Sequence, residues 1–475
     1  MDMQMLASRH CPEPLPDHPA RLSQLATALQ SDLEVLSYPS RNWDYSRGNG
    51  ILEVAIIGAG CAGKSLAFGL RRYGITNIQI VDQCSPGLAG PWRTTARNHT
   101  LRTPKDVSGG MDWGIPNLNV QRWCEAKYGR DYWDTVAYIP RQLWAEYLDW
   151  YEQVLNLPIH YQTPIHDITW DPGQQVFQLH TPDRVIQARF VILASGLEAA
   201  GGKKLPALVE QHLPPQVYAH TADAIEFDQL QGKRVAVMGG GASAFDNALM
   251  ASYAGAQQVD ILVRRSQMPN FNRIRWSEWN GYHRHYIELE DAEKWQYTFA
   301  ELELGQLPPP HTYQEVMRDP RIRVLTGAPL QQVRYEQGCI QGLYGPHHLE
   351  HDFLICGTGY HTDITQCPEL GSLAKQITLW KDRYTPPSTQ NQAGMAHSPY
   401  LGSNLELVPR DPAEDYLRRI FCLTGSVTLL SGFRANLSSL QFVAPRICHA
   451  IGGQLFQEHQ PEIRAAFDSY NVPEF

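Results

Sequence analysis

The chain has 475 residues, of which 43% are hydrophobic and 19% charged, and its formal net charge is −9 at pH 7. A chain of this length holds about two or three domains, and an acidic balance without a block rich in lysine and arginine argues against nucleic acid or an anionic membrane as a partner. No apolar run approaches the ~20 residues that span a bilayer, and residues 1–16 lack the pattern of a secretory signal, so we expect a cytoplasmic protein.

The N-terminal part, residues 1–50, is expected to be an extension of the main fold. Apolar residues recur at helical spacing from His18 to Leu36, which predicts one amphipathic helix. From residue 52 the chain follows a regular α/β pattern. An apolar strand, a helix over Lys64–Tyr73 and a second strand over Ile78–Asp82 predict a βαβ unit.

The turn between the first strand and its helix, Gly58-Ala-Gly60-Cys-Ala-Gly63, fits two phosphate-binding motifs. It is a dinucleotide fingerprint, and together with Lys64-Ser65 it also spells the phosphate-binding loop of NTPases. Both motifs hold phosphate with backbone N–H groups at the start of a helix. Asp82 ends the next strand, where a dinucleotide site places the acid that accepts ribose hydroxyls. We therefore favour a dinucleotide; an NTPase loop, or a turn that binds nothing, is the alternative.

Composition and periodicity predict the structure of the segments from residue 83 to residue 193. Residues 83–135 are rich in glycine, proline and tryptophan and predict loops over a cofactor. Proline at the start and aromatic residues on one face predict a helix over Pro140–Leu155. Val176–Leu179 and Val185–Leu193 alternate like strands.

A second glycine-rich turn, Gly239-Gly-Gly241-Ala-Ser-Ala244, follows the apolar strand Val235–Met238. Alanine is tolerated at the third position because that position needs only close packing of helix and strand. The following strand ends in Arg264-Arg265, where a site for NADH would have an acid. Guanidinium groups there would hold a 2′-phosphate, so we expect NADPH; solvated surface charges are the alternative.

The last part of the chain holds an aromatic-rich excursion over Arg273–Pro310, strands from Arg323 onward, and a closing helix over Ser438–Gly452. The pairs His283-Arg-His285 and His347-His348 lack further ligands at metal spacing, so no metal is expected. Nine dispersed cysteines without a Cys-x-x-Cys pair predict reduced thiols and count against a disulfide-shuttling reductase.

Two glycine turns imply two dinucleotides, most economically a flavin and a nicotinamide that exchange a hydride. The predicted fold is α/β, with two Rossmann-like dinucleotide-binding domains.

Several motifs together resemble the flavin-dependent class B monooxygenases over about residues 52–452. Gly90-Pro-Trp92-Arg93 is similar to their Gly-Gly-x-Trp segment near the flavin, and Ile139-Pro-Arg141 with Tyr147-Leu-x-Trp150 is similar to a helix common in amine N-hydroxylases. Asp352-x3-Cys-Gly-Thr-Gly-Tyr360 and Thr103-Pro-Lys105-Asp106 resemble two motifs of the N-hydroxylating members.

Two patterns depart from the family. The fingerprint between its domains survives only as Tyr218-Ala-His220-Thr221, which weakens a Baeyer–Villiger assignment. Arg102-Thr-Pro104 stands in place of the Thr-Asn-x-Pro pattern of microsomal-type flavin monooxygenases.

The resemblance implies an NADPH domain (231–325) inserted into an FAD domain (51–230 and 326–475). It also implies that NADPH reduces FAD, that reduced flavin and O₂ give a C4a-(hydro)peroxyflavin, and that a small amine or amino-acid-like substrate is N-hydroxylated. Oxygenation of sulfur, Baeyer–Villiger oxygenation and electron transfer to a partner protein are the alternatives, and a homo-oligomer is left open.

The residues implied at the site fall into two groups. Lys105 and Asp106 are the expected catalytic residues, with Lys105 meeting a substrate carboxylate. The expected cofactor-binding residues are Gly58, Gly60, Cys61, Ala62, Gly63, Asp82, Gln83, Trp92, Arg93, Arg141, Gly239, Gly241, Ala242, Ser243, Ala244, Arg264, Arg265, Thr358, Gly359 and Tyr360.

Overall fold

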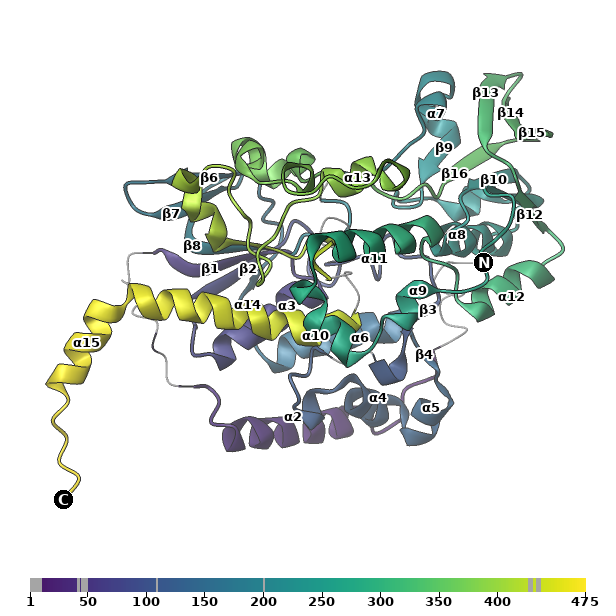
Figure 1. The fold of residues 1–475 in the computed structure, drawn as a ribbon. Coiled ribbons are helices and arrows are strands. Elements are labelled where there is room, and N and C mark those ends of the chain that lie inside the picture. Colours follow the sequence, from purple (N-terminus) through teal and green to yellow (C-terminus); the bar gives the residue numbers. More distant parts are fainter. Residues whose placement is uncertain are drawn as a thin grey trace.

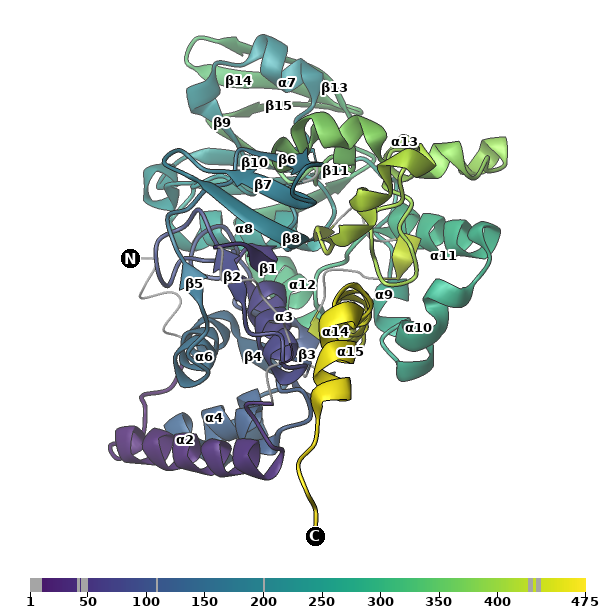
Figure 2. The same ribbon diagram turned by 90° about the vertical axis from the view of Figure 1, so that its left-hand side faces the viewer.

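Two sheets with parallel strands organise the chain (Figures 1 and 2). The fold is that of a computed structural model, and the residues that the structure describes are 11–40, 43, 50–107, 110–199, 201–425, 430–432 and 437–475. In both views the three-stranded sheet β13–β15 lies at one end of the molecule and helices α2 and α4 lie at the opposite end.

The first sheet has seven strands in the order β5-β2-β1-β8-β7-β6, and β17 also pairs with β8. β1, β2, β5, β8 and β17 run parallel, whereas β6, β7 and β8 form an antiparallel meander. The strands are β1 (Leu52–Ile57), β2 (Ile78–Val81), β5 (Ile159–His160), β6 (Asp167–Asp171), β7 (Val176–His180), β8 (Val185–Leu193) and β17 (Ile420–Cys422). This order brings the ends of β1 and β2 together, and with them the first glycine turn and Asp82.

Helices cover this sheet and extend beyond it. α3 (Cys61–Arg72) follows β1 and packs against α14 (Leu437–Glu458). α6 (Arg141–Val154) and α2 (His18–Val35) lie where the sequence predicts helices, and α2 packs against α4 (Val120–Tyr128).

The prediction of loops over residues 83–135 is wrong for its second half. α4 and α5 (Arg130–Thr135) occupy it. α4 buries Val120, Trp123 and Cys124, and the Asn119 side chain accepts a hydrogen bond from the Gln121 backbone N–H at its start. The prediction followed the average composition of residues 83–135, and that average hides the apolar spacing of Val120, Trp123 and Cys124 within the segment.

The second sheet has five parallel strands in the order β12-β11-β10-β16-β9. They are β9 (Tyr218–His220), β10 (Arg234–Met238), β11 (Gln258–Val263), β12 (Ile322–Thr326) and β16 (Phe353–Cys356). α8 (Ala242–Tyr253) and α12 (Pro310–Arg318) pack on this sheet. Because β16 pairs with β10 and β9 pairs with β16, we propose that the second nucleotide unit extends beyond the predicted 231–325 on both sides.

Smaller elements complete the fold. β3 (Thr100–Pro104) and β4 (Tyr138–Pro140) form a two-stranded sheet, and β13 (Leu330–Glu336), β14 (Cys339–Tyr344) and β15 (His347–His351) form an antiparallel one. The aromatic-rich excursion contains α9 (Arg273–Trp276), α10 (Asn280–His285) and α11 (Asp291–Leu304). α7 (Ala207–His212) and α13 (Ala393–Ala396) are short.

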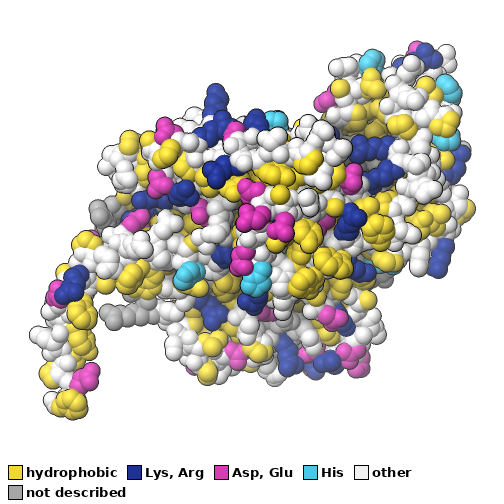
Figure 3. All heavy atoms as spheres, viewed as in Figure 1, with side chains coloured by type: hydrophobic (Ala, Val, Ile, Leu, Met, Phe, Trp, Pro, Cys, Tyr) yellow, Lys and Arg dark blue, Asp and Glu magenta, His cyan; other side chains and the backbone are white. Residues whose placement is uncertain are grey.

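The C-terminal α15 (Gln460–Ser469) continues beyond α14 as an arm that projects from the body (Figures 1 and 2). Figure 3 shows hydrophobic side chains on the surface of this arm. Phe467, Tyr470 and Phe475 are exposed there. No helix among the described residues is long and apolar enough to cross a bilayer.

Candidate dinucleotide sites

The three glycines of the first turn have different physical reasons to be glycine. Gly58 has φ +109°, and a Cβ there would lie 2.4 Å from the backbone oxygen of Ala194. A Cβ on Gly63 would lie 1.9 Å from the Gly58 oxygen, so this position allows α3 to pack on β1. A Cβ on Gly60 would meet no protein atom within 4 Å. The protein itself therefore does not require glycine at position 60, whereas a phosphate group approaching the backbone there would.

Asp82 joins the turn to the end of β2. Its carboxylate accepts the Ala59 backbone N–H at 2.7 Å and the Cys84 backbone N–H at 2.7 Å, and the side chain is buried. Each carboxylate oxygen has a second lone pair, so both can also accept a ribose hydroxyl. Gln83 follows Asp82 and is exposed.

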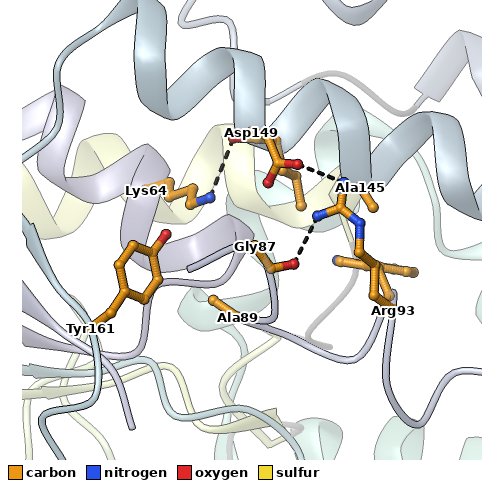
Figure 4. A pocket seen from close by; sticks show the side chains of 9 residues that line it. Lys64, Gly87, Ala89, Arg93, Ala145, Asp149 and Tyr161 are labelled. Carbon is orange, nitrogen blue, oxygen red and sulfur yellow. Dashed lines mark hydrogen bonds and ion pairs between the residues drawn. The ribbon is translucent and has the colours of Figure 1, made fainter. Parts of the chain in front are cut away.

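Lys64 separates the two interpretations of the first turn. Its Nζ lies 2.8 Å from Glu152 Oε2, and the residue is 3% exposed. The Nζ also donates to the Leu148 oxygen on α6 (Figure 4). Tyr161 donates to the same Glu152 oxygen. The lysine of an NTPase loop must reach the phosphates, whereas the ammonium group of Lys64 is bound by Leu148 and Glu152 of α6. The geometry favours the dinucleotide interpretation.

Trp92 and Arg141 lie beside the first turn. A Cβ on Gly90 would lie 3.9 Å from Gly60 Cα, which places the Gly90–Trp92 segment against the turn. Arg141 donates to the Trp92 oxygen at 2.6 Å. Arg93 points to the small hollow of Figure 4, where it pairs with Asp149 and donates to the Gly87 oxygen.

The second turn repeats the geometry of the first. Gly239 has φ +133°, and a Cβ there would lie 2.4 Å from the Gly357 oxygen. A Cβ on Gly357 would in turn lie 3.0 Å from Ala244 Cβ. The glycine before Thr358 is thus required by the turn itself, which gives the Cys-Gly-Thr-Gly-Tyr motif a packing role.

The start of α8 already has one backbone partner. The Ala242 N–H donates to the Gln306 oxygen at 2.8 Å, and a Cβ on Gly241 would lie 3.3 Å from the same oxygen. The segment after α11 therefore lies directly over this turn.

The two arginines after β11 are placed differently. Arg265 donates to the backbone oxygens of Leu304 and Glu303, the last residues of α11. Its guanidinium is thereby held at the carbonyl end of a helix, where a cation is favoured. Arg264 is exposed.

Thr358, Gly359 and Tyr360 contact the segment that leads into the second sheet. Thr358 donates to the Lys204 oxygen, and Lys204 N–H donates to the Gly359 oxygen at 3.0 Å. His220, buried, lies with Nε2 2.9 Å from the Gly359 oxygen. Burial lowers the pKa of His220 and raises that of Tyr360 to about 12, so both side chains are neutral packing groups near pH 7.

Lys105 and Asp106 follow β3, at the end of the two-stranded sheet opposite to Arg141. Lys105 Nζ donates to the Trp133 oxygen at 2.7 Å and lies 5.1 Å from the centre of the Trp133 ring. Asp106 is exposed. One hydrogen bond of the Lys105 ammonium group is thus made to Trp133 of α5.

Sequence reasoning missed an ion pair that joins the two units. Arg102, on β3, donates to Asp246 Oδ2 at 2.8 Å, and Asp246 is 4% exposed on α8. Burial raises the pKa of Asp246 and the charge of Arg102 opposes this rise. Asp246 is a buried carboxylate, and its separation of 144 residues from Arg102 leaves no local signal in the sequence that the two are partners.

Two more arginines lie in this region: the half-buried Arg141, whose charge interacts with Asp246, and the buried Arg97, whose charge interacts with Arg141. Arg97 is 6% exposed and donates to the oxygens of Thr94 and Asp223, while Arg141 donates to Trp92. Burial lowers the pKa of both guanidinium groups, and the charge of Arg141 adds to this effect at Arg97. No group of three or more His, Cys, Asp or Glu side chains suited to a metal occurs among the residues that the structure describes, and all nine cysteines are free.

The residues of the first turn fit FAD. The open space at Gly60, the acid at the end of β2 and the start of α3 lie together, which is the arrangement that holds a dinucleotide pyrophosphate and its ribose.

Comparisons with known proteins agree with this arrangement. Residues 55–287 match the family described as pyridine nucleotide-disulphide oxidoreductase. The chain is 36% identical over 463 residues, 96% of this chain and 97% of the relative, to the FAD-dependent urate hydroxylase of Xanthomonas campestris pv. campestris. It is 26% identical to the L-lysine N6-monooxygenase of Escherichia coli over 139 residues, 29% of this chain and 31% of that protein.

A solved structure shows the same fold. The ornithine N-hydroxylase of Kutzneria sp. 744, with reduced FAD, NADP⁺ and L-ornithine, superposes with a TM-score of 0.66 at 16% identity, covering 85% of this chain and 99% of that chain.

The fold and the two turns thus define a flavoprotein with two dinucleotide units. The likeness over nearly the whole chain then gives its family: the chain belongs to the FAD-dependent monooxygenases of class B, which are oxidoreductases. The predictions of an α/β fold with Rossmann-type sheets, of FAD and of monooxygenase class are confirmed, and the predicted pair of FAD and a phosphorylated nicotinamide is the pair in the Kutzneria structure.

Proposed function

We propose that this protein uses NADPH and O₂ to hydroxylate urate or a closely similar purine. Likeness to the urate hydroxylase over nearly the whole chain carries this proposal, since the likeness to the lysine enzyme covers less than a third of the chain. The engagement of Lys105 by Trp133 supports it, because an amino-acid substrate would draw on that cation for its carboxylate.

The reaction balances with one coenzyme per turnover. NADPH supplies two electrons, one oxygen atom of O₂ enters the substrate, and the other leaves as water. FAD bound at the first turn would supply the chemistry, because a flavin accepts the hydride and makes O₂ reactive.

The protein's own groups hold and shield the reacting parts. The first turn and Asp82 would fix the flavin, the second turn would fix the coenzyme, and Arg264 would contact its 2′-phosphate. Trp92 and Trp144, with ring centres 6.4 Å apart, cover the first turn, and Trp144 donates to Cys61 Sγ. Apolar cover of this kind excludes water, which is the condition for transferring oxygen without loss.

N-hydroxylation of a small amine is the second candidate. The motif that ends in Tyr360 and the fold of the ornithine N-hydroxylase favour it. The test is to reduce the holoenzyme with NADPH without oxygen, and then to admit isotopically labelled O₂ with urate, lysine, ornithine or cadaverine. We expect label in a urate product and urate-dependent consumption of NADPH. A labelled hydroxylamine with no urate product would favour the second candidate, and peroxide release with every substrate would contradict both.

A further inference from the structure

The Arg102–Asp246 ion pair connects the two nucleotide units at the start of α8. Arg102 lies on the two-stranded sheet β3–β4, whose strand β4 leads directly into Arg141, whereas Asp246 lies on the helix that follows the second turn. The Arg102 guanidinium is also 3.4 Å from Ser243 Oγ, on the second residue of α8. A cation from one unit therefore sits where the other unit would receive phosphate.

Stability alone gives a weak reason for this pair. A buried carboxylate loses hydration, and its attraction to an arginine seldom does more than offset that loss. What the pair does provide is orientation, because Asp246 is 4% exposed and fixes one edge of a guanidinium that is itself 33% exposed. The contacts with Asp246 and Ser243 both use Nη2 of Arg102, so Nη1 remains as a donor for a ligand.

The charge around the pair points to an anion. Arg97, Arg102 and Arg141 bring three cations to this region, and Asp246 is the carboxylate that pairs with one of them. The hydrogen bonds of Arg97 and Arg141 described above go to backbone oxygens, which carry no full charge. A buried or half-buried cation whose hydrogen bonds go to neutral oxygens favours a bound anion that balances its charge.

We propose that Arg102 contacts the pyrophosphate of the nicotinamide dinucleotide at the second turn, and that Asp246 is the positioning residue that holds its guanidinium there. The proposal rests on the proposed function, because it requires that dinucleotide at this turn. A guanidinium offers two parallel donors to a phosphate and complements the N–H groups at the start of α8. The coenzyme would then be gripped by both nucleotide units at once.

A contact with the pyrophosphate predicts the same effect on both coenzymes. NADP⁺ and NAD⁺ share the pyrophosphate and differ in the 2′-phosphate, so loss of Arg102 weakens both coenzymes by the same factor. Loss of a residue that contacts the 2′-phosphate weakens only NADP⁺.

The test compares holoenzyme variants. Arg102→Gln alone leaves Asp246 buried without its partner, so the main variant is Arg102→Gln with Asp246→Asn. Arg234→Gln is the matched control, because Arg234 is also 33% exposed and pairs with an aspartate, Asp352. This pair lies where β10 and β16 begin, at the ends of these strands away from the second turn. Dissociation constants for NADP⁺ and NAD⁺ are read from the flavin spectrum, and FAD content and melting temperature are measured beside them.

We expect the double variant to raise both coenzyme dissociation constants at least about tenfold, with FAD content unchanged, as loss of one charge-assisted hydrogen bond implies. The control should match the unaltered enzyme. Arg102→Lys keeps the cation without its forked geometry and should lie between the two. If the double variant does not fold, a rise of about threefold or more in Arg102→Lys is the expected result.

Three outcomes separate the possible failures. Unchanged coenzyme affinity in a folded double variant, or in Arg102→Lys where only that variant folds, overturns the proposal. So does a higher Michaelis constant for urate, an anion at neutral pH, with unchanged coenzyme affinity, because Arg102 would then contact the substrate. If the unaltered holoenzyme itself binds neither NADP⁺ nor NAD⁺, the proposed function fails as well.

Discussion

Gly60 allows the flavin site to be tested apart from the fold. Its φ of −73° and ψ of −172° are open to alanine, and an added Cβ would meet no protein atom within 4 Å. Gly60→Ala should therefore leave the apoprotein as stable as before. A bound pyrophosphate would approach this backbone closely, so the methyl group should interfere with the ligand alone.

The expected size follows from crowding a fitted contact. One methyl group forced into such a contact costs about 1–3 kcal/mol, which raises the dissociation constant of FAD about 5- to 150-fold. Gly63→Ala is the contrasting variant, because its Cβ would lie 1.9 Å from the Gly58 oxygen. That clash is within the protein and lowers the free energy of unfolding of the apoprotein itself.

Two measurements separate an effect on FAD affinity from an effect on stability. Urea unfolding of the apoproteins compares their stability, and titration with FAD, followed by quenching of flavin fluorescence, compares their affinity. Gly60→Ala should differ from the unaltered chain only in the titration, and Gly63→Ala in the unfolding. A Gly60→Ala protein with unaltered FAD affinity would refute the placement of the pyrophosphate at this turn.

Three further predictions address other parts of the molecule. Arg264→Ala should raise the Michaelis constant for NADPH about 10- to 100-fold more than that for NADH. Arg265→Ala should change the ratio of these two constants far less, because α11 holds the Arg265 guanidinium. An equal change of the ratio in both variants would refute the distinction between Arg264 as a 2′-phosphate ligand and Arg265 as a structural contact. Burial raises the pKa of Asp260, but hydrogen bonds from His351 and Arg323 outweigh it and lower the value to about 2. Since the unfolded chain then binds the proton more tightly, about 2 kcal/mol of stability is present above pH ~4 and is lost as the pH falls towards ~2. Urea unfolding should show this slope, and Asp260→Asn should lack it. Lys105→Met should change the Michaelis constant for urate by less than about threefold, whereas a carboxylate anchor would lose about 10- to 100-fold in the same steady-state assay.

Both glycine turns could be predicted from the sequence because their requirements are local. Each turn needs a buried strand before it, a helix after it, and residues small enough for the backbone to approach a neighbour. A Cβ added to Gly58 or to Gly239 would lie 2.4 Å from a backbone oxygen, in each case that of the residue that follows the neighbouring strand. Asp82 was predictable for the same reason, since it lies one strand further on.

Contacts between distant segments could not be predicted in this way. Arg102 and Asp246 are 144 residues apart, and neither lies in a pattern that marks it. The contact at the start of α8 comes from the backbone oxygen of Gln306, which residue identity does not reveal. Arg265 looks like a phosphate ligand in sequence because the helix end that receives its guanidinium belongs to a segment read only as aromatic-rich.

Strand β17 can pair with β8 only late in synthesis. Residues 194–419 separate the two strands, so the ribosome makes every strand of the five-stranded sheet, the last ending at Cys356, before it makes β17. Until then the end of β8 lacks a neighbour on one side, and an uncovered strand edge can pair with another chain. A message truncated between codons 357 and 419 would thus release a nascent product with a whole second sheet and an open first one.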